Sequence, residues 1–423
     1  MDAVESPRTA PPDPSRFDAA AYLRLYPDIG GAIARGDVIS AWEHFRRHGH
    51  LEGRVPNDFD AAFYLRSYPI AAAEIAAGRA TDAFDHYRRL GQARGFLPNP
   101  AAPRPDNPAA PPRFGGLWPD LPNAEDLIEG KLETGRITER DAELLRFWRE
   151  NGYVILRGAA SDALTEAACA DLDRAYAGFF PDMLFECHPI SPQRIAWRPE
   201  VAEHPAKALD IHHFSPATRA VMFCPAVAQF LGLIFESHAF ASQTLGFLRG
   251  SAQEGHQDSA YVPYTIGRCF AASWIALEDV TLGAGELFYY PASHRFPDYL
   301  YADAFKSVHE AMRMDALADP RTAVSGHVGS LTERAAAAGM AKLPFAARRG
   351  DALIWHADLV HGGNPVSRDI TRKSLVTHYC PKRLAPLFAE QSGLGFFGHR
   401  GHAFTSGHYP TFAPAGPQPD PLL

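Results

Sequence analysis

The sequence predicts an α+β protein: a double-stranded β-helix, or jelly roll, with flanking helices, preceded by a small all-α repeat domain. Three observations predict this organisation. A 42-residue pattern occurs twice near the N-terminus, a Pro/Ala-rich segment follows it, and the remainder holds short apolar runs separated by Gly, Pro and Asp. With 423 residues, the chain is long enough for a large core and a smaller appended domain.

The N-terminal pattern predicts two helical repeats, at residues 17–57 and 59–99. "FDAAAYLRLYPD" returns as "FDAAFYLRSYPI", and the offset stays constant without an insertion, which indicates two copies of one supersecondary unit. Each copy is expected to form two short helices around a Pro/Gly break. Pairs of identical residues that lie 42 apart include Phe17/Phe59, Tyr22/Tyr64, Pro27/Pro69, Gly36/Gly78, His44/His86, Gly49/Gly91 and Asn57/Asn99. We expect His44 and His86 to pack in small helical cores rather than to bind metal.

The remaining boundaries follow from composition. Residues 1–16 are polar and proline-containing and predict a disordered N-terminus. Residues 100–113 predict a stiff, extended linker, because proline and alanine dominate them. We expect a second domain at 114–390 and a C-terminal tail at 391–423.

Short apolar runs predict the strands of the second domain. A helix–strand–helix segment at 139–176 comes first, and turn residues separate the runs that follow, as is typical of a jelly roll with flanking helices. Residues 300–345 are expected to be a mostly helical insertion that covers the site as a lid. The runs are "TLGFLRG" (244–250), "FAASWIAL" (270–277), "ELFYYP" (286–291), "DALIWHA" (351–357) and "KSLVTHYC" (373–380).

Composition narrows the classes of function. The formal net charge is −8 and no basic run recurs, which argues against nucleic-acid binding. Five cysteines without a C-x-x-C motif fit reduced thiols in a cytoplasm. The N-terminus lacks the apolar region of a signal peptide, and no apolar run reaches the roughly 18 residues of a membrane span. We therefore expect a cytoplasmic protein without a transmembrane segment.

The stretch "GHQDSAYVPY" contains a candidate metal-binding pair, His256 and Asp258. On a strand, residues two apart point to the same face, so an imidazole and a carboxylate would lie side by side. That arrangement suits a divalent metal, and equally a hydrogen-bonded pair in a loop. His361, in "DALIWHADLVHGGNP", follows a predicted strand and is the candidate third ligand. Two histidines and one carboxylate leave one face of a metal open, as in non-haem Fe(II) oxygenases.

Arg372 and Ser374 form a candidate anchor for a co-substrate. Arg372 lies 11 residues after His361, on the next expected strand, and Ser374 shares its face. A guanidinium beside a hydroxyl suits a carboxylate held by two hydrogen bonds, better than a lysine would.

Together these motifs resemble the phytanoyl-CoA dioxygenase family of Fe(II)/2-oxoglutarate oxygenases. The resemblance rests on H-x-D…H-x(10)-R-x-S, "NGYVILRG", W-x-A-L-x-D-V-T…G-x-L…P-A-S-H-R and GD-x-L-x-x-H…L-x-H-G, and covers about residues 140–385. It implies a cupin-like jelly roll that uses Fe(II), 2-oxoglutarate and O₂. It also implies that His256, Asp258 and His361 bind the iron.

The resemblance implies further roles around 2-oxoglutarate. Arg372 would pair with its distal carboxylate, and Ser374 would add a hydrogen bond. Trp274 and Gln243 match residues that lie beside the co-substrate in the family. Arg249 stands where relatives usually have lysine, which leaves its role open.

Other nearby residues are assigned from position. Tyr261 and Tyr264 follow the first ligands and are expected to border the substrate pocket. His356 would face the opposite side of its strand from His361, His294 fits a structural turn, and Arg368 is expected to face solvent. The tail histidines His399, His402 and His408 favour an aromatic segment laid across the barrel over a second metal site.

The resemblance implies that 2-oxoglutarate is converted to succinate and CO₂ while hydrogen is removed from an unactivated C–H bond of a small-molecule, lipid or glycan-related substrate. Asp258 argues for hydroxylation, because halogenating relatives have a small residue at this position. Epimerisation, desaturation and ring formation stay open. No basic cluster suited to CoA stands out, so phytanoyl-CoA is not carried over. The repeats resemble FD-x-x-x-YL units found beside enzymatic domains in bacterial envelope and glycan-related proteins, which suggests a protein or glycan-biosynthesis partner.

Two other classes of protein remain open. A non-catalytic jelly-roll binding protein could be recruited through the repeats, but it would not need Arg372 and Ser374 at co-substrate spacing. A cupin-type metalloenzyme that does not use 2-oxoglutarate would more usually have three or four histidine ligands.

Overall fold

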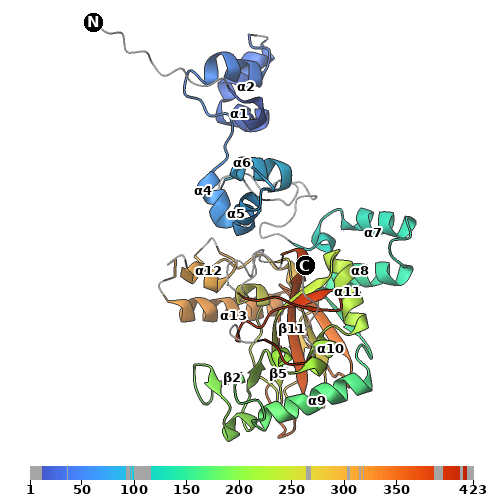
Figure 1. The fold of residues 1–423 in the computed structure, drawn as a ribbon. Coiled ribbons are helices and arrows are strands. Elements are labelled where there is room, and N and C mark those ends of the chain that lie inside the picture. The colour runs from blue at the N-terminus through green and yellow to red at the C-terminus, as the bar shows by residue number, and fades with distance from the viewer. Residues whose placement is uncertain are drawn as a thin grey trace. The chain divides into compact units, whose positions relative to one another are not determined.

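The chain forms two compact units, Met1–Arg113 and Phe114–Leu423 (Figure 1). The predicted linker at 100–113 and most of the predicted disordered N-terminus lie outside the described residues, although Pro14–Arg16 forms a 3₁₀ turn. The computed structural model describes residues 12–35, 37–91, 96, 98–99, 116–262, 268–302, 305–313, 316–317, 319–384, 394–409 and 413–416.

The described residues of the N-terminal unit form six short α-helices, and each helix of the second set begins 42 residues after its counterpart in the first. The sequence predicted two helices per repeat, whereas the structure has three. Proline causes the difference, because it disfavours helical angles at the residue before it: Tyr26 has φ −130° and ψ 74° and separates the first two helices. The helices are α1 (Ala19–Leu25), α2 (Pro27–Ala34), α3 (Ala41–His44), α4 (Ala61–Ser67), α5 (Pro69–Ala76) and α6 (Ala83–His86).

A tyrosine–histidine hydrogen bond lies in each repeat, part-buried in the first and buried in the second. The hydroxyl of Tyr64 is 2.8 Å from Nδ1 of His86, whose Nε2 is 2.7 Å from Glu74, and Tyr22 contacts His44 in the same way at 3.0 Å. Both histidines therefore have structural partners within their own repeat.

Replacing Gly91 with alanine is expected to destabilise the second repeat by about 1–3 kcal/mol, because the added Cβ would collide with the hydroxyl of Tyr64. Hydrogen exchange over residues 61–91 of the full chain measures the effect. Gly78→Ala is not a suitable control, since Gly78 has a positive φ of 74°. The Cβ added in Gly30→Ala would meet no atom within 4 Å, so this variant should leave the hydrogen-exchange protection of residues 61–91 unchanged. If Gly91→Ala were protected as well as the wild type over these residues, the prediction would be contradicted.

The C-terminal unit is built on two facing antiparallel sheets. The larger has the strand order β1-β9-β6-β11-β5-β4-β2-β3, with β13 parallel to β5 and β12 paired to β13, and the smaller has the order β10-β7-β8. This arrangement, with helices outside it, is the predicted jelly-roll fold. The strands of the larger sheet are β1 (Tyr153–Leu156), β2 (Leu184–Glu186), β3 (Ile195–Ala196), β4 (Lys207–Leu209), β5 (Ala239–Phe247), β6 (Ala271–Ala276), β9 (Ala352–His356), β11 (Ser374–Pro381), β12 (Phe397–His399) and β13 (His402–Phe404). Those of the smaller sheet are β7 (Leu287–Tyr289), β8 (Leu343–Pro344) and β10 (His361–Gly363).

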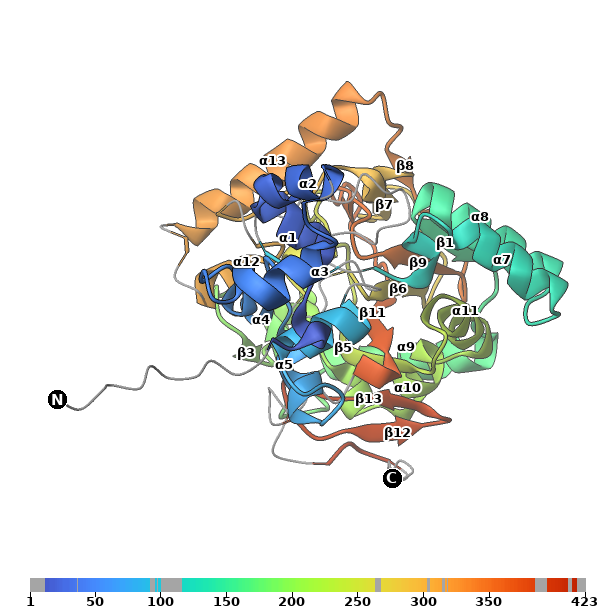
Figure 2. The same cartoon turned by 90° about the horizontal axis from the view of Figure 1, so that it is seen from above.

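Helices cover the outer face of the larger sheet. In Figure 2, α9 and α10 lie on one side of β5 and β11, whereas α13 lies on the other side, near β7 and β8. The helices before β5 are α7 (Ala124–Glu133), α8 (Glu139–Asn151), α9 (Asp162–Tyr176), α10 (Pro216–Met222) and α11 (Pro225–Phe235). The insertion between β7 and β8 contains α12 (Val308–Arg313) and α13 (Pro320–Ala337), in agreement with the predicted helical segment.

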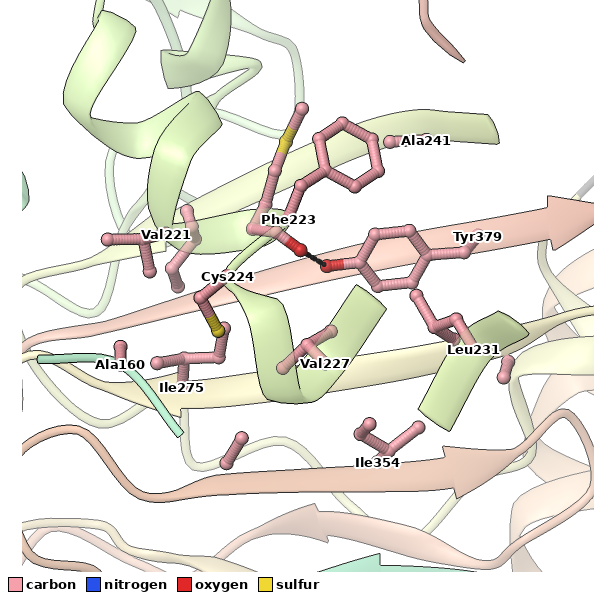
Figure 3. Close-up of a cluster of buried hydrophobic side chains, with 14 of the residues drawn as sticks. Ala160, Val221, Phe223, Cys224, Val227, Leu231, Ala241, Ile275, Ile354 and Tyr379 are labelled. Carbon is pink, nitrogen blue, oxygen red and sulfur yellow. Dashed lines mark hydrogen bonds between the residues drawn. The ribbon is translucent and has the colours of Figure 1, made fainter. Parts of the chain in front are cut away.

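Because both faces of the larger sheet are covered, its central strands are buried throughout, while alternate side chains still point to opposite faces of the sheet. On β11, Leu375 and Tyr379 join the core against the helices, and Tyr379 donates a 2.6 Å hydrogen bond to the carbonyl of Met222 at the end of α10 (Figure 3). Val376 and His378 therefore face the other sheet and line the cavity of the candidate site, and Ser374 lies on the same face of the strand by alternation.

Within the described residues, no single helix is long and apolar enough to cross a membrane. The bent pair α10 and α11 reaches that length and composition only when the two helices are taken together.

Candidate functional site

A two-stranded bridge brings His256 and His361 together. His256 donates its backbone N–H to the carbonyl of His361 at 2.9 Å, and the reverse hydrogen bond measures 3.0 Å. The ring centroids lie 4.5 Å apart. Asp258 is not on the strand with His256, as the alternation argument supposed, but begins a 3₁₀ turn at Asp258–Ala260. The turn still directs its carboxylate toward both imidazoles.

The three candidate ligands form a compact, buried donor set. Oδ1 of Asp258 lies 3.6 Å from Nε2 of His256 and 3.7 Å from Nε2 of His361. All three donor atoms fall within 4.8 Å of one another, and among the described residues this is the one group of His, Cys, Asp or Glu with that spacing. Two nitrogens and one oxygen at this spacing suit a divalent transition metal.

Backbone carbonyls orient the two histidines. Nδ1 of His256 is 2.9 Å from the carbonyl of Glu254, and Nδ1 of His361 is 3.0 Å from that of Leu359. A carbonyl only accepts hydrogen bonds, so each Nδ1 carries the proton and each Nε2 presents its lone pair to the site, where the amide of Gln253 lies 3.3 Å from Nε2 of His256.

Electrostatics favour the protonation states that bind metal. Burial lowers the pKa of His361 to about 4, although Asp258 acts to raise it. Burial alone would raise the pKa of Asp258, but the neighbouring His361, His378 and His256 together hold it well below its usual value. At neutral pH the imidazole of His361 is neutral and the carboxylate is ionised, as metal ligation requires.

Arg372 projects into the same cavity with its hydrogen-bonding capacity partly unused. Its guanidinium is 2% exposed, donates from Nη1 to the carbonyl of Gly285 at 2.7 Å, and lies 5.4 Å from the ring centroids of Phe247 and Trp274. Burial lowers the pKa of Arg372 to about 10, so it remains a cation at neutral pH. No carboxylate among the described residues forms an ion pair with it.

Three buried donors in or next to this part of the cavity have no hydrogen-bond partner in the described chain: Nε of Arg372, Nε1 of Trp274 and Oγ of Ser374. Arg372 and Trp274 line the cavity, whereas Ser374 does not. Buried donors and unpaired buried cations are costly unless an acceptor meets them. A carboxylate ligand would satisfy the guanidinium and the hydroxyl together, so these residues fit the distal end of 2-oxoglutarate.

Two further residues at the site were not predicted from the sequence. His378 and Trp355 line the cavity and contact Asp258, through Nε2 at 3.3 Å and Nε1 at 2.8 Å respectively. The alternation that placed Ser374 on the inner face of its strand also places His378 there, four residues later. No comparable sequence pattern indicated Trp355, because a tryptophan in an apolar strand usually packs in the hydrophobic core.

Several predicted residues lie elsewhere. Gln243 does not line the cavity; its amide donates to Nδ1 of His378 at 3.0 Å. Arg249 donates to the carbonyl of Ala202 at 3.0 Å and pairs with Asp369 outside the cavity. Tyr261 lies next to the site, with its ring 5.8 Å from that of His256. Tyr264 falls outside the described residues.

The remaining histidines have other surroundings. His356 faces away from the cavity and lies 3.2 Å from Asp120, and His294 packs beside it at 5.3 Å between ring centroids. In the tail, β12 and β13 extend the larger sheet. Nδ1 of His408 pairs with Asp210 at 2.7 Å, and His402 accepts from the backbone of Ala239 at 3.1 Å.

A buried charge cluster connects the insertion to the candidate ligands. Asp358, three residues before His361, pairs with Arg268 at 2.6 Å and with Lys306 at 3.1 Å, and it accepts a hydrogen bond from Ser259, next to Asp258. Lys306 belongs to the insertion. The cluster therefore fixes this part of the insertion against the segment that carries Asp258.

Replacing Asp358 with asparagine is expected to lower the free energy of unfolding by about 3–5 kcal/mol, because Arg268 and Lys306 would stay buried without their carboxylate. Urea unfolding measures the change. Asp369→Asn removes an exposed pair with Arg249 and serves as the control, with an expected change below about 1 kcal/mol. Equal losses in both variants would contradict the prediction.

Asp358 should also contribute to acid sensitivity. Burial acts to raise the pKa of this carboxyl. Arg268 and Lys306 lower the pKa by more than burial raises it, so the net shift is downward. Its stabilisation is therefore fully present above the unfolded pKa near 3.9 and is lost as the pH falls below that value. Unfolding at pH 6 and pH 3 should show a smaller difference between wild type and Asp358→Asn at the lower pH.

Comparisons with known proteins place these features in a family. Residues 148–374 match the family model described as phytanoyl-CoA dioxygenase (PhyH), and no curated protein matches the chain. Similar solved structures include the non-haem α-ketoglutarate-dependent epimerase SnoN from nogalamycin biosynthesis (19% identity, 57% of this chain and 83% of that one, TM-score 0.40). They also include the carbocyclase SnoK from the same biosynthesis (17%, 59% and 85%, TM-score 0.41) and EctD from S. alaskensis with 2-oxoglutarate and 5-hydroxyectoine (16%, 59% and 77%, TM-score 0.41).

The family match covers more than half of the 423 residues and includes all three candidate ligands together with Arg372 and Ser374. The chain therefore belongs to the phytanoyl-CoA dioxygenase family and is an iron- and 2-oxoglutarate-dependent oxygenase.

Proposed function

We propose that this oxygenase hydroxylates an unactivated C–H bond of a small-molecule, lipid or glycan-related substrate, with Fe(II) held by His256, Asp258 and His361. The observation that carries the proposal is the presence, in one buried cavity, of this donor set beside a guanidinium with an unused donor. When bound, iron with 2-oxoglutarate and O₂ supplies the oxidising power that removes a substrate hydrogen, while succinate and CO₂ are released.

The residues of the chain have separate tasks in this proposal. His256 and His361 present neutral nitrogens, and Asp258 supplies the anionic oxygen. Arg372 and Ser374 hold the distal carboxylate of 2-oxoglutarate and so fix the direction from which it reaches the metal. Burial of the cavity excludes water and strengthens these charge interactions.

The substrate is proposed to approach beside Tyr261, under the insertion. Tyr261 contacts the ring of His256 on one side and that of His327, from α13, on the other, at 5.8 and 6.3 Å between centroids. Tyr299 and Tyr301 pack against His327 at 4.8 and 5.7 Å. An aromatic wall next to the ligands suits a compact organic substrate.

Hydroxylation is favoured over other outcomes because Asp258 supplies a third protein ligand, where halogenating relatives have a small residue. We further propose a cytoplasmic location, which is supported by five cysteines that are widely spaced and form no C-x-x-C motif. The repeats are proposed to recruit a protein or a glycan-biosynthesis partner. Their helices and aromatic cores offer a scaffold for such contacts, and affinity capture with and without residues 1–113 would test this role.

The function is tested by incubating the protein with Fe(II), 2-oxoglutarate and ¹⁸O₂ across a panel of candidate substrates. We expect one compound to accelerate succinate formation and to gain one ¹⁸O atom. Substrate-dependent succinate without ¹⁸O in the product would overturn hydroxylation in favour of epimerisation, desaturation or ring formation. Absence of any turnover of 2-oxoglutarate beyond that of His361→Ala, across the panel, would count against the proposed site itself.

A further inference from the structure

The two oxygens of Asp258 have different surroundings. Oδ1 faces Nε2 of His256 and Nε2 of His361, at 3.6 and 3.7 Å. Oδ2 faces the protein instead: the indole N–H of Trp355 donates to it at 2.8 Å, and Nε2 of His378 lies 3.3 Å away. Oδ1 is thus directed at the candidate metal position, and Oδ2 is directed at the sheet.

The neighbour of His378 determines which of its nitrogens carries the proton. The carboxylate of Asp258 can only accept, so a hydrogen bond from Nε2 requires a proton there. The other nitrogen, Nδ1, must then accept, and the side-chain amide of Gln243 donates to it at 3.0 Å. The reverse assignment would place a bare nitrogen against an ionised carboxylate. Gln243 therefore selects the form of His378 that donates to Asp258.

The register of the larger sheet explains how these side chains meet. Ala272 on β6 is paired with Trp355 on β9 on one side and with His378 on β11 on the other, and His378 is paired in turn with Gln243 on β5. The four residues form one row across four strands. The small side chain of Ala272 separates Trp355 from His378, so the two larger side chains can converge on Asp258 above it.

We propose that Gln243, His378 and Trp355 are positioning residues that hold Asp258 as a ligand through one oxygen. The inference rests on the proposed function, because it takes Asp258 to be an iron ligand. With Oδ2 held by two donors, only Oδ1 is available to the metal. A carboxylate free to turn could offer both oxygens and would occupy a position needed by 2-oxoglutarate or O₂.

Burial makes this arrangement difficult to replace with solvent. Trp355 is 1% exposed, His378 is 3% exposed and Asp258 is 5% exposed. When a buried acceptor loses its donor, water cannot readily take the donor's place. Removing either donor should therefore change how Asp258 meets the metal, and not only the stability of the fold.

The test compares Fe(II) binding by the full-length wild type with that of Trp355→Phe, His378→Phe and the double variant, under anaerobic conditions. Fe(II) dissociation constants come from chelator competition, and near-infrared magnetic circular dichroism reports the coordination of iron before and after 2-oxoglutarate is added. We expect Fe(II) affinity to fall about 10- to 100-fold, as for other partners of metal ligands. We also expect altered ligand-field bands and weaker 2-oxoglutarate binding.

Two further variants separate positioning from a structural role. His378→Gln retains an N–H donor and should restore the wild-type bands and bring Fe(II) affinity to within a few-fold. Thr377→Val is the matched control, since Thr377 is buried on the same strand but points to the opposite face, and it should change neither readout. If circular dichroism shows that His378→Phe is unfolded, Trp355→Phe and Gln243→Leu carry the test.

The outcomes distinguish this inference from the proposed function. A wild type that binds Fe(II) and responds to 2-oxoglutarate, together with variants of unchanged affinity and bands, would overturn the positioning role and leave the function standing. A wild type whose iron does not respond to 2-oxoglutarate would overturn the proposed function, and the inference with it. Altered bands in the donor-removing variants, with rescue by His378→Gln, would support both.

Discussion

Replacing Arg372 with leucine is expected to weaken 2-oxoglutarate binding about 100-fold. The side chain is buried beside two aromatic rings, and its Nε and the hydroxyl of Ser374 are unpaired within the described chain. Removing one partner of a buried, hydrogen-bonded charge pair costs about 2–5 kcal/mol, and each 1.4 kcal/mol is about tenfold in affinity. Anaerobic calorimetry with the Fe(II)-loaded protein measures the loss.

Two further variants test whether the lost 2-oxoglutarate affinity comes from the guanidinium group of Arg372. Arg372→Lys keeps the charge but not the planar pair of donors, so we expect it to recover only part of the affinity. Arg368→Leu removes an exposed arginine from the preceding turn and should leave 2-oxoglutarate binding unchanged. If the Arg372→Leu protein bound 2-oxoglutarate as tightly as wild type, the co-substrate would have to be anchored elsewhere.

Replacing Asp258 with alanine should reduce succinate formation by about a thousandfold or more. The substitution removes the anionic donor between His256 and His361, and it leaves Trp355 and His378 without their acceptor. A bound metal contributes several kcal/mol to a catalysed step, and each 1.36 kcal/mol corresponds to about a factor of ten in rate. Fe(II) affinity and 2-oxoglutarate turnover should be measured together.

The control for this variant is a carboxylate with no part in the site. Asp369 is exposed and pairs with Arg249 outside the cavity, so Asp369→Ala is expected to retain wild-type iron affinity and turnover. If Asp258→Ala kept both its iron affinity and its turnover, the donor set proposed for the metal would be incorrect.

The jelly roll and the candidate ligands were accessible from the sequence because each had a local signal. Short apolar runs between turn residues indicated the strands, and "GHQDSA" with the later "LVHGG" indicated three donors. Alternation along one strand placed Ser374 beside Arg372. These inferences needed spacing along the chain and no knowledge of which strands pair.

The positions of Trp355, His378 and Gln243 depended on information of another kind. Trp355 and His378 lie in runs that read as core strand, and Gln243 was expected beside the co-substrate instead. Their meeting depends on the register between β9, β6, β11 and β5. Side chains that converge from three strands have no characteristic spacing in the sequence, so no sequence motif indicates that they meet. The additional helix in each repeat was missed for a local reason, because Pro27 begins a new helix instead of only interrupting one.

The central claim is that one cavity holds both iron and 2-oxoglutarate, and the visible spectrum of the purified protein under anaerobic conditions tests it most directly. Adding Fe(II) and then 2-oxoglutarate should produce a weak metal-to-ligand charge-transfer band, which should disappear in His256→Ala and weaken in Arg372→Ala. Wild-type protein that binds Fe(II) but develops no band with 2-oxoglutarate would contradict the account.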